Sequence, residues 1–115
     1  MARKEPLEPY YRIDTSEAKE MLDSGSGAVV IDVRRPDEWA AGHVQGAIHI
    51  PVDDIMTRIE ELPTETNLLF ICAQGVRSGL ACEFASAMGY SSDRLFNIED
   101  GTAPWIEKGY PTEQG

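Results

Sequence analysis

The chain has 115 residues, of which 42% are hydrophobic and 26% are charged, a balance typical of one folded domain rather than a disordered tail or a fibre. Ten Lys and Arg residues against twenty Asp and Glu residues give a formal net charge of −10, which repels phosphate backbones and anionic lipid headgroups. We therefore expect neither nucleic acid nor a membrane as a partner.

The two cysteines, Cys72 and Cys82, lie in one stretch whose spacing fits neither a disulfide framework nor a metal site. No apolar run follows the basic residues of the N-terminus, and no window approaches the roughly eighteen apolar residues of a membrane span. These features predict a protein of the cytoplasm, a reducing compartment, without a bound metal.

The chain is predicted to begin with a lead-in segment, a short strand and a helix. Residues 1–9 carry two prolines, several charges and little to bury, so we expect them to be flexible and the folded domain to cover residues 10–115. An extended segment over 10–13 precedes a helix with Asp14 or Thr15 as its N-cap, and this helix should stop at a run of serines and glycines.

Strand and helix patterns then alternate through the middle of the chain. A continuous β-branched run over 28–32 is typical of a strand covered on both faces. Proline at the first turn and glycine at the end predict a short helix over 36–42, and a brief strand over 47–50 follows. An aspartate cap and a later proline predict a helix over 53–61, and residues 68–71 form a second buried strand.

The last part of the chain is predicted to hold a long helix, a short strand and a final helix. The long helix covers about 77–88, and its core face is predicted from an apolar stripe of Leu80, Ala81, Phe84, Ala85 and Met88. At about 100° per residue, Cys82 lies well off the centre of this stripe, so we expect it to leave the core face. A strand over 94–97 and a helix over 103–108 complete the chain.

This alternation predicts a small α/β fold with a mainly parallel sheet and helices on both faces. In such sheets the functional crevice lies outside the carboxyl ends of the strands. Asp32 and Cys72 each end a predicted strand, so both are expected at that crevice.

The segment that follows the strand over 68–71 carries the residues best suited to chemistry. Cys72 ends the strand, Arg77 opens the next helix, and the four residues between them are Ala73, Gln74, Gly75 and Val76. Such a loop can turn its backbone N–H groups inward, and the helix N-terminus adds positive potential. A free cysteine has a pKa near 8.5, and about 2 kcal/mol of stabilisation makes it a thiolate at neutral pH. We expect Cys72 to be a nucleophile and the N–H groups of residues 73–77 to bind its anionic substrate, although a free cysteine can also simply pack a strand end.

The loop length separates two chemistries. Protein tyrosine phosphatases place five residues between cysteine and arginine, whereas here Arg77 follows after four and Ser78 stands at the phosphatase position. A shorter loop encloses a smaller pocket, so phosphatase or arsenate reductase chemistry is the weaker alternative. Beyond the arginine, Ser78 is expected to join a small, mostly neutral rim.

The chain resembles the single-domain rhodaneses, a sulfurtransferase family, in segments spaced through most of its length. The similar segments are Cys72 to Arg77, Ile31-Asp32-Val33-Arg34, Glu38-Trp39, Gly42-His43-Val44, Gly46 to Pro51, Trp105 and Gly109-Tyr110-Pro111. Two positions depart from the family pattern, because Gln45 stands where proline is common and Asp100-Gly101 where two glycines are usual. These departures bear on local loop geometry more than on activity.

The resemblance implies a rhodanese-like fold and a sulfur relay without metal or organic cofactor. The Cys72 thiolate would take sulfur from a small anionic donor such as thiosulfate, release sulfite, and pass the sulfur from a persulfide to a thiol or cyanide acceptor. Arg77 would hold the anionic donor, or would only cap and orient the loop.

Two further interpretations stay open at this point. The domain could be a sulfur carrier that exchanges sulfur with a protein donor or acceptor, and its negative charge favours a basic partner. Asp32 and Arg34 could line the crevice, although an ion pair with each other or with Glu38 is the favoured interpretation. His43 is interpreted as a structural hydrogen-bonding residue rather than a base for Cys72.

Overall fold

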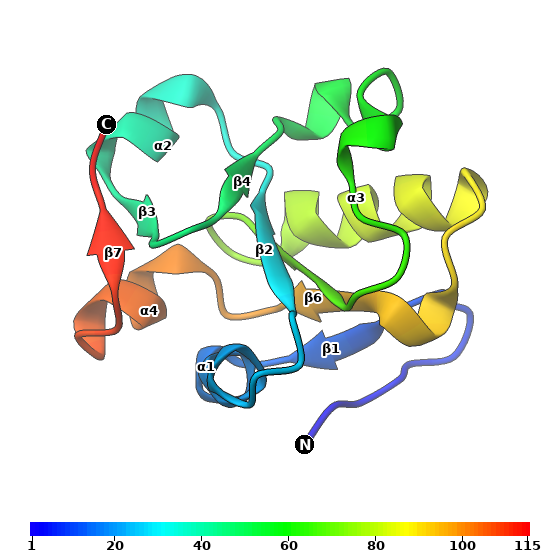
Figure 1. Ribbon diagram of the computed structural model, residues 1–115, viewed down its shortest axis with the longest axis horizontal. Coiled ribbons are helices and arrows are strands. Elements are labelled where there is room, and N and C mark those ends of the chain that lie inside the picture. Colours follow the sequence, from blue (N-terminus) through cyan, green and yellow to red (C-terminus); the bar gives the residue numbers. More distant parts are fainter.

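A five-stranded sheet runs through the middle of the computed structural model, which describes residues 1–115 (Figure 1). The strands lie in the order β1-β6-β5-β2-β4, and every neighbouring pair is parallel. Their bounds are β1 Tyr11–Ile13, β2 Val29–Asp32, β4 Ile48–His49, β5 Leu68–Ile71 and β6 Leu95–Ile98. All four residues of the central strand β5 are buried, which is why its sequence is an unbroken apolar run.

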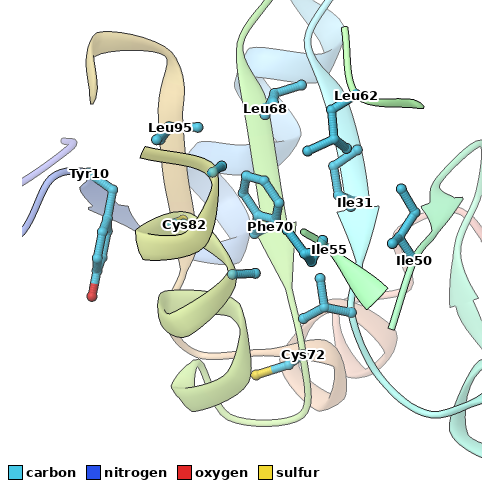
Figure 2. Close-up of a cluster of buried hydrophobic side chains, with 13 residues drawn as sticks. Tyr10, Ile31, Ile50, Ile55, Leu62, Leu68, Phe70, Cys72, Cys82 and Leu95 are labelled. Atoms are coloured by element: carbon cyan, nitrogen blue, oxygen red, sulfur yellow. The ribbon is translucent and has the colours of Figure 1, made fainter. Parts of the chain in front are cut away.

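Helices cover both faces of this sheet, as the alternating pattern predicts. The α-helices are α1 Thr15–Asp23, α2 Pro36–Ala41, α3 Val76–Ala87 and α4 Thr102–Glu107. A first buried cluster joins α3 to β2 and β5 on one face, and Phe70 lies at its centre (Figure 2). A second cluster on the other face joins α1 and α4 to the sheet through Ala18, Leu69 and Trp105. None of the helices has the length and apolar content needed to cross a bilayer.

The start of α1 confirms the capping signal. The Asp14 carboxylate accepts a hydrogen bond from the backbone N–H of Glu17 at 2.8 Å, and the Glu17 carboxylate accepts one from the N–H of Asp14 at 2.8 Å. This reciprocal capping box satisfies two N–H groups that a helix otherwise leaves unpaired. Of the two candidate caps, Asp14 is the one used.

The prediction of a helix over 53–61 is wrong. The segment forms two short 3₁₀ turns, η1 Val52–Asp54 and η2 Ile59–Glu61. Tyr90 follows the end of α3, and its hydroxyl donates to the carbonyls of Ile59 and Leu62 at 3.1 and 2.5 Å. A helix of this length is only marginally stable by itself, so tertiary contacts override its propensity.

The core face of α3 differs in part from the prediction: Ala81 and Ala85 are buried as expected, but the face also includes Cys82. Leu80 and Met88 are 42% and 43% exposed, whereas Cys82 is fully buried. Small residues form the face that meets the sheet: Ser78, Gly79, Ala81, Cys82 and Ala85. A Cβ atom at Gly79 would lie 3.1 Å from the Tyr10 hydroxyl, so this face lies too close to its neighbours for large side chains. The helix therefore packs through its small side chains rather than its large ones.

The remaining strands and the third 3₁₀ turn, η3 Ser92–Arg94, are short. β3 His43–Val44 and β7 Thr112–Glu113 pair antiparallel in a two-stranded sheet beside α4, which sequence analysis did not predict. Two residues are too few to show the alternation that identifies a strand. In the N-terminal segment, Arg3 forms an isolated bridge to Arg12; the flexibility expected for residues 1–9 stays a prediction.

Candidate active site

Cys72 directly follows β5, at the edge of the sheet where the parallel strands end. The residue is 1% exposed, and its Sγ atom accepts a hydrogen bond from the N–H of Gly75 at 3.1 Å. Gly75 lies at φ 85°, a left-handed conformation that a side chain would disfavour. This turn folds the loop back over the sulfur and starts α3 one residue later.

The segment between β6 and α4 holds the cysteine loop in place. Both the N–H and the hydroxyl of Thr102 donate to the Cys72 carbonyl, at 3.1 and 2.9 Å. A Cβ atom on Gly75 would collide with the backbone of Glu99, and one on Gly101 would collide with the Ala73 carbonyl. Only glycines at these two positions allow the two loops to lie so close together.

Ser78 and Asn97 complete a hydrogen-bonded ring around the sulfur. Ser78 Oγ lies 3.3 Å from Cys72 Sγ and donates to Asn97 Oδ1 at 2.5 Å. Asn97 Nδ2 in turn donates to the carbonyl of Gly75 at 3.0 Å, and the N–H of Gly75 donates to the sulfur. The ring couples the sulfur, the loop and β6.

The pKa of Cys72 is lowered from the ordinary value of a cysteine. Burial raises it, but hydrogen bonds from the Ser78 side chain and from the backbone N–H groups of Ser78, Gln74 and Gly75 together lower it by more. By contrast, burial raises the pKa of Cys82 well above its ordinary value. Of the two cysteines, Cys72 is therefore the one whose surroundings favour the thiolate form.

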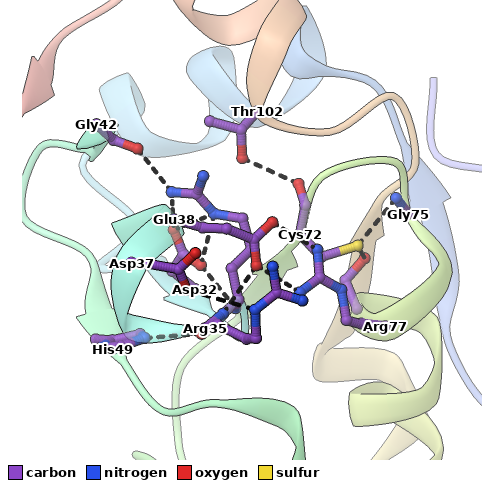
Figure 3. A network of polar contacts seen from close by, with 12 residues as sticks. Asp32, Arg35, Asp37, Glu38, Gly42, His49, Cys72, Gly75, Arg77 and Thr102 are labelled. Carbon is purple, nitrogen blue, oxygen red and sulfur yellow. Dashed lines mark hydrogen bonds and ion pairs between the residues drawn. The ribbon is translucent and has the colours of Figure 1, made fainter. Parts of the chain in front are cut away.

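Arg77 lies on the first turn of α3 and points across the loop to α2 (Figure 3). Its guanidinium donates to both carboxylate oxygens of Glu38, with Nη1 to Oε1 at 2.7 Å and Nη2 to Oε2 at 3.0 Å. The hydrogen bond to Arg77 is the main reason that the pKa of Glu38 falls to about 2, and the same pair raises the pKa of Arg77.

Asp32 and Arg34 form a second, buried ion pair. Arg34 Nη2 donates to Asp32 Oδ2 at 2.8 Å and to the carbonyl of Gly42 at 2.7 Å. The Asp32 side chain is fully buried and also accepts the N–H of Arg34 at 2.9 Å. The pair connects the end of β2 to the turn after α2.

Both histidines of the chain pack against Trp39. The rings of His43 and His49 stack on the indole with centroids 3.4 and 4.6 Å away. His43 Nδ1 hydrogen-bonds the Trp39 carbonyl, and His49 Nε2 bonds the Arg34 carbonyl, both at 2.8 Å. Neither is hydrogen-bonded to Cys72. No three His, Cys, Asp or Glu side chains converge in an arrangement that could hold a metal ion.

Two hollows flank the cysteine loop, one on each side of Gln74. One, of about 530 Å³, is lined by the first turns of α3 and by β6. The other, of about 590 Å³, is lined by Arg34, Ala73, Asp100 and the start of α4. The loop thus exposes both of its sides while covering the sulfur.

Comparison with known proteins assigns this arrangement to a family. The family model of the rhodanese-like domain matches residues 14–108. The chain belongs to the rhodanese-like domain family.

Relatives of this rhodanese-like domain share most of its length. A sulfurtransferase of Allochromatium vinosum is 29% identical over 99 residues, which are 86% of this chain and 91% of that protein. The protein YtwF of Bacillus subtilis is 32% identical over 93 residues, 81% of this chain and 87% of that protein. The crystal structure of a rhodanese-related protein from Thermoplasma volcanium matches with a TM-score of 0.76 at 31% identity, over 90% of this chain and 98% of that one. The expected rhodanese-like fold is confirmed.

The rhodanese-like domain brings most of the predicted site residues together at one edge of the sheet. Residues 73–75 form the loop over the Cys72 sulfur, Val76 and Arg77 lie in the first turn of α3, and the Asp32–Arg34 pair lies alongside. Of the departures from the family pattern, Asp100 adopts no positive φ, so a residue with a side chain fits there, whereas Gly101 has φ 84° and ψ −166°.

Sequence reasoning missed two residues of the site. Ser78, expected on the rim, is fully buried beside the sulfur, and Asn97 was not considered. A polar residue inside the apolar strand β6 was the available signal for Asn97, because a buried amide in a central strand needs a partner. Sequence reasoning also left open the partner of Arg77, which is Glu38 on α2.

Proposed function

We propose that this protein is a sulfurtransferase that moves sulfane sulfur from thiosulfate or a related donor to a thiophilic acceptor through a persulfide on Cys72. The observation that carries the proposal is the enclosure of Cys72 Sγ by hydrogen-bond donors, with the N–H of Gly75 at 3.1 Å and a lowered thiol pKa. The family relationship and the name of the Allochromatium vinosum relative support the same reaction class.

The reaction consists of two balanced displacements. The Cys72 thiolate attacks the outer sulfur of the donor, a new S–S bond forms, and the S–S bond of the donor breaks with its electron pair leaving on sulfite or on a thiolate. A thiol or cyanide then attacks the outer sulfur of the persulfide, and the Cys72 thiolate leaves. The two steps need no external oxidant or reductant, and they give ping-pong kinetics because the first product leaves before the acceptor reacts.

In the first step, the loop that follows Cys72 stabilises the charge of the persulfide. A persulfide carries its negative charge on the outer sulfur, one bond length beyond the position of the thiolate. The backbone N–H groups of residues 73–77 are the donors available to that charge, and they are already ordered by Gly75, Thr102 and Asn97. Preorganised donors stabilise the charge without a cost for rearranging the loop.

Intact-mass spectrometry after incubation with thiosulfate, and separately with a thiol persulfide, tests the proposal. The wild-type protein is expected to gain one sulfur and to lose it to cyanide as thiocyanate. Cys72→Ser should gain none, and Cys82→Ala, which keeps Cys72, should gain sulfur like the wild type. Absence of any gain by the folded wild-type protein with either donor would overturn the proposal.

A further inference from the structure

The cations nearest to the cysteine loop are already neutralised by carboxylates of the protein. Arg77 is bound by both oxygens of Glu38, and Arg34 is bound by Asp32. The exposed Arg35 lies 3.4 Å from the carboxylate of Asp37. A dianionic donor that approaches the loop therefore meets paired charges rather than a free guanidinium.

We propose that Glu38 sets the donor class of the site: by occupying Arg77, it disfavours dianionic donors such as thiosulfate and favours persulfides whose carrier group is uncharged. This inference rests on the proposed function, because it concerns which donor delivers sulfur to Cys72.

The geometry of Glu38 makes it a strong competitor for Arg77. Two parallel hydrogen bonds occupy the Nη1 and Nη2 donors of the guanidinium, an edge that suits two-point binding of a sulfonate group equally well. Glu38 Oε1 also accepts the N–H of Arg35 at 3.0 Å, and this bond at the start of α2 fixes the carboxylate in place. With a pKa of about 2, Glu38 is ionised throughout the physiological range, so an arriving sulfonate meets a fixed negative charge.

On the side of the loop that faces the hollow of about 590 Å³, other carboxylates also disfavour dianionic donors. Asp100 and Glu107 line the hollow that also contains Ala73 and Gln74. Asp100 Oδ2 accepts the Thr15 hydroxyl at 3.1 Å, but its buried Oδ1 has no hydrogen-bond partner. On the other side, Arg12 lines the hollow of about 530 Å³ and donates to both carboxylate oxygens of Glu8, at 2.9 and 2.6 Å. Neither side of the loop therefore presents an unpaired cation to a dianion.

A persulfide with an uncharged carrier group meets less of this repulsion in both directions of the first step, because it carries at most the one negative charge of its outer sulfur, whereas thiosulfate carries two. In the reaction of a neutral RS–SH donor, the Cys72 thiolate attacks the outer sulfur, the donor S–S bond breaks, and RS⁻ leaves while Cys72 holds S–SH. The leaving group carries one negative charge, whereas sulfite leaves with two. Repulsion from Glu38 is therefore smaller for the organic donor both when it arrives and when it leaves.

The test compares Glu38→Gln with Asp37→Asn. Both variants remove one carboxylate charge from the first turn of α2, but only Glu38 is bonded to Arg77. For each protein, kcat/KM is measured with thiosulfate and with the persulfide of 2-mercaptoethanol, whose carrier group is uncharged. We expect the ratio of the thiosulfate value to the persulfide value to rise about tenfold in Glu38→Gln and to stay within about twofold of wild type in Asp37→Asn.

A double variant shows whether the rise in the kcat/KM ratio depends on Arg77. In Arg77→Gln/Glu38→Gln the rise in the ratio should disappear, because the freed guanidinium is what would bind the sulfonate. An unchanged or lower ratio in Glu38→Gln, or an equal rise in Asp37→Asn, would overturn the inference while leaving the persulfide chemistry intact. Failure of every donor to load Cys72 would instead overturn the proposed function.

Discussion

The Ser78 hydroxyl has one proton and two neighbours that can accept it, Asn97 Oδ1 at 2.5 Å and Cys72 Sγ at 3.3 Å. While the proton lies on the bond to Asn97, the serine oxygen can accept from a Cys72 thiol. When Cys72 is a thiolate, rotation of the hydroxyl supplies the sulfur with a hydrogen bond. Ser78 can thus serve both protonation states of Cys72, and the ring around the sulfur can adjust without moving the backbone.

Replacing Ser78 by alanine is expected to raise the pKa of Cys72, because the thiolate loses a hydrogen-bond donor while the site remains buried. The pH dependence of iodoacetamide alkylation of Cys72 measures this shift. Ser86→Ala, on the same helix but outside the ring, serves as the control and should leave the alkylation profile unchanged. A profile identical to wild type in Ser78→Ala would show that the hydroxyl does not act on the thiolate.

The Glu38–Arg77 pair predicts a specific dependence of stability on pH. The pKa of Glu38 is about 2 in the folded protein, below the ordinary value of 4.5, so its contribution is present above the unfolded pKa and is lost as pH falls through the folded pKa. We expect the difference in free energy of unfolding between wild type and Glu38→Gln to be largest near neutral pH and to shrink from about pH 5 towards pH 2. Urea unfolding at several pH values measures it; a constant difference would contradict the assignment.

At the scale of elements, the orientation of α3 connects the core to the site. The face of this helix that meets the sheet consists of small residues, and the same rotation places Ser78 against Cys72 and directs Arg77 towards α2. The large residues Leu80 and Val76 remain exposed as a consequence. The geometry of the site therefore depends on how α3 packs, as well as on the loop that precedes it.

A pair of charge substitutions tests this orientation. Cys82→Asp is expected to lower the free energy of unfolding by about 3 kcal/mol or more, because it places an unpaired carboxylate in a fully buried position. Leu80→Asp, two residues away on the exposed side, should lower it by about 1 kcal/mol or less. Chemical denaturation distinguishes the two; the reverse order would support the apolar stripe predicted from the sequence.

The contact between the β6–α4 segment and the cysteine loop gives another prediction. Gly101 adopts φ 84° and ψ −166°, so an alanine there costs about 1–3 kcal/mol in backbone strain, and its Cβ collides with the Ala73 carbonyl. Gly101→Ala is expected to lose stability and most sulfur transfer. Gly89→Ala, with φ 101° but open space around it, should lose stability alone, as measured by denaturation and by thiocyanate production. Full transfer in Gly101→Ala would show that the loop tolerates displacement.

For the whole molecule, the order of the strands predicts where stability is concentrated. β5 lies at the centre of the sheet with all its residues buried, whereas β3 and β7 form a two-residue ladder at the periphery. In native-state hydrogen exchange, the amides of β5 and β2 should exchange only through global unfolding, and those of β3 and β7 through local opening. Equal protection of both groups would show that the small sheet opens only with the core.

The signals that sequence analysis interpreted correctly are local ones. The helix N-cap at Asp14, the apolar runs of the buried strands and the glycine turn after Cys72 each act through residues a few positions apart. Such signals place Cys72, its loop and the parallel sheet, because hydrogen bonding and backbone preference over short distances do not require the rest of the fold.

The structure corrected or completed predictions wherever the partners are distant in sequence. Asn97 lies 19 residues from Ser78, Glu38 lies 39 residues from Arg77, and Tyr90 bonds the segment that fails to form a helix from 28 and 31 residues away. These contacts depend on how far α3 is rotated and on how closely it approaches the sheet, and that is decided by packing of the whole core. The sequence by itself determined the fold class, the nucleophile candidate and the loop; only the tertiary structure decided which groups surround the sulfur and which carboxylate occupies the arginine.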